Sequence, residues 1–183
     1  MSGQDGAGGP DLNPAAIVAA LNRNQVRYVI IGAFAAIAQQ APIPATRDID
    51  LTPEASGENL ARLSRALTDL DARIRTEAVP DGLPFGHDAA SLAAAEVWNL
   101  VCADGEFDIS FHPSGFAGGY AQLAVHARRL RVGEVEVVVA DLADVIRSKE
   151  AAGREKDSMQ LPILRRTLEQ VRQRERDNPG LEP

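Results

Sequence analysis

Val29-Ile-Ile-Gly-Ala33 and Thr46-Arg-Asp-Ile-Asp-Leu51 are the two most informative segments of this sequence. The first is an apolar run typical of a buried strand, and Gly32 ends it before an alanine-rich stretch of helix formers. The second alternates polar and apolar residues with the period of a strand, so Asp48 and Asp50 share one face. The segments together predict a strand, a glycine turn, a helix and a second strand.

Outward from these segments, periodicity and capping residues predict the other elements. Asn13 caps a first helix that has Pro14 at its first position. The leucines of 56–70 share a helical face, and a final helix is expected over 156–173. Further helices are expected at 120–127 and 141–152, strands at 97–102, 106–111, 130–132 and 135–139, and a loop at 80–87. This order predicts an α+β fold, a mixed β-sheet flanked by helices, with helices at the C-terminus.

Composition narrows the class of protein. The 183 residues are 45% hydrophobic and 25% charged, and their net charge of −7 excludes a protein that coats nucleic acid by bulk charge. A single cysteine excludes an intrachain disulfide framework, and no apolar run approaches the ~20 residues of a membrane span. We therefore expect a cytoplasmic protein with one domain over 11–176, a disordered tail at 1–10 and a flexible tail at 177–183.

Three acidic residues form the candidate catalytic group. Asp48 and Asp50 repel each other on one strand face, and Asp108 stands between apolar residues on another predicted strand. Carboxylate oxygens suit a hard cation such as Mg²⁺ or Mn²⁺, and three of them can hold two metal ions for phosphoryl or nucleotidyl transfer. The alternative, a merely solvated strand face, is common for such a pair.

Gly32 favours the functional interpretation. Glycine allows a ligand to approach the backbone closely, and the helix start behind it offers free N–H groups to a phosphate. The spacing would place a triphosphate beside the metal ligands.

These residues resemble the nucleotidyltransferase superfamily typified by DNA polymerase β. Within it, the Thr46–Leu51 run and Ser148-Lys-Glu-Ala-Ala-Gly-Arg-Glu-Lys-Asp157 look most like the group of AbiEii-type toxins. The resemblance covers residues 25 to 170. It departs from the pattern at Ala33, where the family has Ser or Gly, so a phosphate contact there must come from the backbone N–H.

The resemblance implies a site and a reaction. Asp48, Asp50 and Asp108 would be metal ligands, with Asp108 helping to activate an acceptor hydroxyl. The donor would be an NTP, the acceptor a tRNA 3′ end, and the partner a cognate antitoxin protein. Lys149 would be the catalytic lysine that meets the triphosphate, and Arg154 and Asp157 would be the polar pair that supports it at the nucleotide site.

Two further features leave alternatives open. Arg47 precedes the acids and either supports structure or reaches the nucleotide. Residues 147–176 hold nine Lys or Arg against five Asp or Glu, which fits an RNA-binding face or a solvated helix equally well. The alternative functions are a small-molecule, antibiotic-type nucleotidyltransferase and a degenerate fold that only binds, which Ala33 favours.

Overall fold

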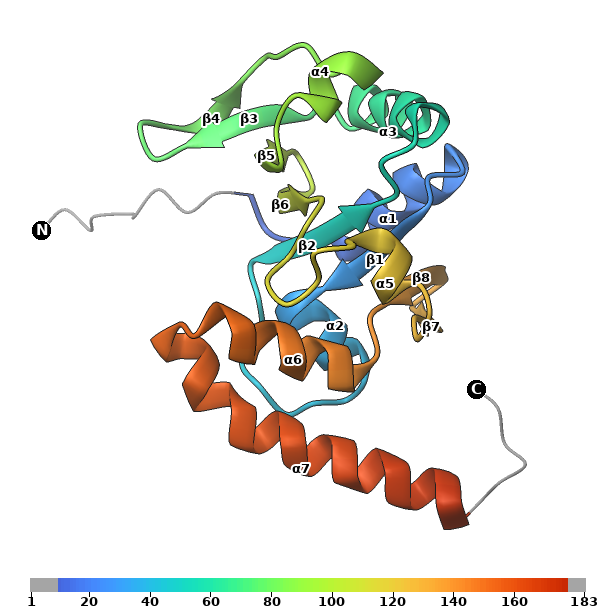
Figure 1. The fold of residues 1–183 in the computed structure, drawn as a ribbon. Coiled ribbons are helices and arrows are strands. Elements are labelled where there is room, and N and C mark those ends of the chain that lie inside the picture. The colour runs from blue at the N-terminus through green and yellow to red at the C-terminus, as the bar shows by residue number, and fades with distance from the viewer. Residues whose placement is uncertain (1–9, 178–183) are drawn as a thin grey trace, which may run out of the picture.

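An eight-stranded mixed sheet forms the centre of the structure, a computed structural model that describes residues 10–177 (Figure 1). The strand order is β4-β3-β5-β6-β2-β1-β8-β7. The strands are β1 Tyr28–Ile31, β2 Asp48–Pro53, β3 Arg73–Thr76, β4 Val79–Leu83, β5 Val97–Cys102, β6 Gly105–Ser110, β7 Arg128–Val132 and β8 Val135–Val139. The helices are α1 Pro14–Arg23, α2 Gly32–Ala38, α3 Gly57–Asp69, α4 Ala89–Ala93, α5 Tyr120–Leu123, α6 Leu142–Ala152 and α7 Glu155–Asp177. The predicted α+β class is confirmed.

The central strands form both parallel and antiparallel pairs. β2 is parallel to β6 and antiparallel to β1, while β1 is parallel to β8. Figure 1 shows α6 and α7 stacked together at one end of the molecule, with the β3–β4 hairpin at the other end. The buried apolar side chains join in one hydrophobic core beneath the sheet and between the helices.

Local sequence explains the helix boundaries. Asn13 and Ser56 cap α1 and α3 through their side chains, and Asp141 caps α6. Gly153 ends α6 in the left-handed conformation, with φ of +62°. No helix within residues 10–177 has the length and hydrophobicity needed to cross a bilayer.

Several predicted boundaries are wrong. The expected loop at 80–87 begins with β4, and its partner β3 was not expected at all. The helix predicted over 120–127 ends at Leu123, whereas the last helix is longer than 156–173. The expected tails lie almost wholly outside the described residues, which exclude 1–9 and 178–183.

Candidate active site

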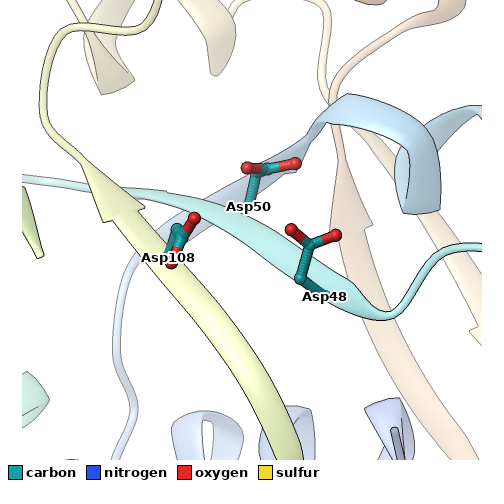
Figure 2. A group of neighbouring side chains, drawn as sticks. All are labelled: Asp48, Asp50 and Asp108. Atoms are coloured by element: carbon teal, nitrogen blue, oxygen red, sulfur yellow. The ribbon is translucent and has the colours of Figure 1, made fainter. Parts of the chain in front are cut away.

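The three predicted acids meet on one face of the sheet (Figure 2). In the parallel β2–β6 pair, Asp50 lies directly opposite Asp108, and Asp48 is two residues along β2 on the same face. Carboxylate oxygens of the three side chains lie within 4.8 Å of one another. The alternating residues Ile49 and Leu51 are buried in the core, as the strand period predicts.

The cluster is short of positive charge. Burial and then the neighbouring carboxylates of Asp48 and Asp108 raise the pKa of Asp50 to about 7, despite the nearby cations of Arg154 and Lys149. Burial also raises the pKa of Asp108. A set of three oxygen ligands whose negative charge is only partly offset fits a divalent cation such as Mg²⁺ or Mn²⁺.

Gly32 is required by Asp50 itself. It has φ of +79°, and a Cβ at this position would lie 2.1 Å from Asp50 Oδ2. The glycine thus lets the backbone pass beside the carboxylate of Asp50. The sequence had suggested that this glycine makes room for a ligand, whereas the structure shows that it makes room for Asp50. Because α2 behind it has only seven residues, the expected contribution of a helix dipole is small.

A buried ion-pair network fixes the opposite wall. Lys149 Nζ donates to Asp157 Oδ1 at 2.7 Å, and Arg154 Nε donates to Asp157 Oδ2 at 2.6 Å. Burial alone would raise the pKa of Asp157, but these two hydrogen bonds outweigh it and lower the pKa. The three residues span the end of α6, the following loop and the first turn of α7, so they join the two helices.

A cavity of about 260 Å³ lies between these two groups. Its charged lining residues are Asp48, Asp50, Asp108, Lys149, Arg154 and Lys156, and Gly32, Ala33, Thr46 and Gln160 also line it. A second cavity of about 290 Å³ shares Gly32, Asp50, Lys149 and Arg154 with the first and adds Ser110, Ser114 and Ser148. The exposed Arg47 does not line either cavity, so its contact with nucleotide stays a prediction.

Two residues that sequence reasoning missed touch the acids. Thr46 Oγ1 donates to Asp48 Oδ1 at 2.7 Å and fixes that side chain at the start of β2. Arg75 Nη2 donates to Asp108 Oδ1 at 3.2 Å from β3. The contact of Thr46 with Asp48 could have been predicted from the sequence, because a hydroxyl stands two residues before the acid. The contact of Arg75 with Asp108 depends on the order of the strands.

Buried Gln39 sets the spacing between α2 and α6. Its Nε2 donates to Ala35 O at 2.8 Å and to Ala140 O at 2.9 Å, and its Oε1 accepts from Leu142 N at 3.1 Å. All three bonds are buried, which makes them costly to break. They hold Gly32 at the start of α2 in a fixed position relative to Lys149 on α6.

No model of a known protein family matches the sequence, and no curated protein sequence matches it. Solved structures do match. The lincomycin-bound lincosamide antibiotic adenylyltransferase LnuA has a TM-score of 0.57 at 13% identity, covering 85% of this chain and 98% of that one. The solution structure of the antibiotic-resistance factor ANT(2'')-Ia has a TM-score of 0.53 at 16% identity, covering 89% of both chains. This chain has the nucleotidyltransferase fold.

A crystal structure of ANT(2'')-Ia in complex with adenylyl-2''-tobramycin gives a TM-score of 0.50 at 16% identity, over 90% of this chain and 95% of that one. The predicted nucleotidyltransferase fold is therefore confirmed, and these structures lend no support to the AbiEii-type subgroup. A fold hosts many chemistries, so the reaction is argued from the site.

Proposed function

We propose that this protein is a metal-dependent nucleotidyltransferase, which transfers NMP from an NTP to a hydroxyl of an acceptor. The observation that carries the proposal is the group Asp48, Asp50 and Asp108, whose oxygens lie within 4.8 Å on a cavity that also holds three cationic side chains. Anionic phosphates and metal-binding carboxylates would otherwise repel each other in such a space.

Asp48, Asp50 and Asp108 would hold Mg²⁺ or Mn²⁺, which supplies charge neutralisation and activates an oxygen nucleophile when bound. Arg154 and Lys156 offset the charge of the triphosphate, while Lys149 is oriented by Asp157 toward the same cavity. Ala33 contributes only its backbone N–H, and Gly32 keeps space for the Asp50 carboxylate. Asp108 would help to activate the acceptor hydroxyl by accepting its proton. Positioning and electrostatics therefore account for most of the catalysis.

For the acceptor, we propose an RNA, with a tRNA 3′ end as the specific case and a cognate antitoxin as the partner, acting in the cytoplasm. The resemblance of the Thr46–Leu51 and Ser148–Asp157 runs supports this assignment. So does the surplus of cations toward the C-terminus. Within residues 10–177, six of the nine Lys and Arg at 147–176 form no ion pair: Arg147, Lys156, Arg166, Arg172, Arg174 and Arg176.

A small-molecule acceptor is the second candidate. It is favoured by the solved structures, one of which is a lincosamide adenylyltransferase with lincomycin bound and another of which holds adenylyl-2''-tobramycin. The matches cover 98% and 95% of those two chains, so nearly the whole of each is built like this one.

Label transfer tests both assignments. The protein is incubated with Mg²⁺ and each α-³²P-labelled NTP in turn, with total tRNA, lincomycin or tobramycin as the acceptor. We expect label on tRNA from the wild type, and a loss of at least about a thousandfold in the Asp48→Asn and Asp50→Asn variants. Glu134→Gln, which removes a fully exposed carboxylate in the β7–β8 turn, is the matched control and should retain activity.

Each alternative outcome has a distinct meaning. Label on an antibiotic alone would assign a small-molecule enzyme. Nucleotide binding without transfer to any acceptor would identify a fold that only binds, with Ala33 as the first residue to restore to serine.

A further inference from the structure

Two arginines of β3 lie on the same sheet face as the carboxylates. In the registers of neighbouring strands, Asp50 is opposite Asp108 and Asp108 is opposite Asn99. Arg73 pairs with Val101 on β5, so Arg75, two residues on, falls opposite Asn99 in the antiparallel ladder. Opposite residues in a sheet point to the same face. Arg73 and Arg75 therefore lie on the carboxylate face, beyond Asp108 and toward the sheet edge.

The hydrogen-bonding capacity of Arg75 is only partly used. Its Nη2 donates to Asp108 Oδ1, and its Nε lies 3.5 Å from Glu106 Oε2 without forming a hydrogen bond to any residue in 10–177. A guanidinium has five N–H donors, and because the Nε of Arg75 is buried, its two Nη groups are the ones left to contact a ligand.

Arg73 is more open. Its side chain is 43% exposed, and its ion pair within the described residues is a 3.4 Å contact with the exposed Asp71. A Cβ at Gly82 of β4 would lie 2.6 Å from Arg73 Cβ, so the glycine lets β4 pack against the base of this side chain. The stem is thus held while the guanidinium stays accessible.

The direction of attack places the acceptor on this side. In a phosphoryl-type displacement the attacking and leaving oxygens lie roughly in line across the reacting phosphorus. The cations suited to the leaving pyrophosphate, Lys149 and Arg154, line both cavities that contain Gly32 and Asp50, whereas Arg73 and Arg75 line neither of these cavities. An attacking hydroxyl must therefore arrive from the opposite side, over Asp108 and toward β5 and β3.

We infer that Arg73 and Arg75 bind a phosphate of the acceptor strand next to its attacking hydroxyl, so that the acceptor is the 3′ end of a polynucleotide. The inference rests on the proposed function and specifies its acceptor. Guanidinium groups bind phosphate through paired, charge-assisted hydrogen bonds.

Equilibrium binding tests the inference without requiring catalysis. The probe is a 5′-fluorescein-labelled twelve-residue oligoribonucleotide with a free 3′-hydroxyl, followed by anisotropy in Mg²⁺ over a range of salt concentrations. We expect Arg73→Gln to weaken binding about five- to tenfold, and the double Arg73→Gln/Arg75→Gln variant to weaken it further. The slope of log K against log salt should fall in magnitude by about 0.7 for each contact removed.

Arg131→Gln is the matched control, because Arg131 is an exposed arginine on β7 at the opposite edge of the sheet. Its binding and salt slope should match the wild type. A DNA oligonucleotide of the same sequence distinguishes general phosphate binding from RNA recognition, and weaker binding to DNA is expected for an RNA acceptor. Mn²⁺ titration of Arg73→Gln by electron paramagnetic resonance should give wild-type affinity, which separates loss of a phosphate contact from damage to the carboxylates.

Wild-type affinity and salt slope in the double variant would overturn the inference, as would absence of RNA binding by the wild type. Label transfer to tobramycin with unaltered RNA binding in the variants would also overturn it, while leaving nucleotidyl transfer standing. Loss of RNA binding in the variants of a protein that transfers no label would support the phosphate contact and refute the proposed reaction.

Discussion

Asp50 and Asp157 are two aspartates largely shielded from water, yet their surroundings shift their pKa values in opposite directions. Asp157 receives hydrogen bonds from Lys149 and Arg154, and its pKa is lowered. Asp50 has two carboxylates as neighbours, and its pKa is raised to about 7. The first carboxylate stabilises the junction of α6 and α7. The charge of the second is only partly offset by Arg154 and Lys149, which fits a binding site for a cation.

Asp157→Asn should produce the largest change in stability. It leaves the Lys149 ammonium buried without its counter-charge, and breaking a buried pair in this way costs about 3–5 kcal/mol. Urea unfolding followed by circular dichroism measures the loss. Folding lowers the pKa of Asp157. Its ionised carboxylate therefore stabilises the fold when the pH is above the pKa of the unfolded chain, and this stabilisation is lost as the pH falls through the pKa of the folded state.

Glu150→Gln is the control for this comparison. Glu150 pairs with Arg165 at 2.5 Å and also joins α6 to α7, but both side chains are exposed. The expected cost is below about 1 kcal/mol. Equal losses in the two variants would contradict the importance of the buried network.

Gly32→Ala should destabilise the fold by about 2–4 kcal/mol, since the new Cβ meets Asp50 Oδ2 and φ is positive. It should also weaken Mn²⁺ binding, because Asp50 must move. Gly133→Ala shares the positive φ, at +61°, but its Cβ meets nothing within 4 Å. A loss of Mn²⁺ affinity in both variants would mean that backbone strain, rather than contact with Asp50, is responsible.

Asp50→Asn should change the free energy of unfolding in the opposite direction to Asp157→Asn. Without divalent cations at pH 8, we expect the variant to be about 2–3 kcal/mol more stable than the wild type, because an ionised Asp50 is unfavourable in the folded state. The raised pKa means that this advantage is complete above pH 7 and vanishes as the pH falls toward 4. Urea unfolding at pH 8 and pH 4 gives both values, and a variant less stable than the wild type at pH 8 would refute the assignment.

Adding Mg²⁺ or Mn²⁺ should produce the smallest of these changes in stability. A cation at ten times its Kd stabilises the wild type by about 1.4 kcal/mol, or a rise of about 3–5 °C in Tm. Differential scanning calorimetry should show little rise for Asp50→Asn. An equal rise in both proteins would place the bound cation elsewhere.

Much of the site was predictable because it depends on local patterns. The strand period of 48–51 fixes the direction of Asp48 and Asp50, and the apolar residues around Asp108 fix its direction. Their meeting also needed β2 and β6 to be neighbours, which the resemblance to a known superfamily supplied. The grouping of Lys149, Arg154 and Asp157 followed from the same resemblance.

The β3–β4 hairpin was missed for a physical reason. Its first strand, Arg-Ile-Arg-Thr at 73–76, has a single apolar residue, Ile74, which packs against the core. Glycine and proline in β4 then conceal the strand pattern. The contact of Arg75 with Asp108 joins residues 33 positions apart through the order of three strands, and no local signal reports it.

The strand order also assigns different dynamics to the two sides of the site. The carboxylates stand on β2 and β6 near the centre of the sheet, whereas β3 lies one strand from the edge, next to the short outermost strand β4. Amide protons in β2 and β6 should exchange with solvent only when the whole chain unfolds, and those of β3 through cheaper local opening. The carboxylates near the centre of the sheet should therefore keep a fixed geometry, while Arg73 and Arg75 stand on a strand that opens more readily.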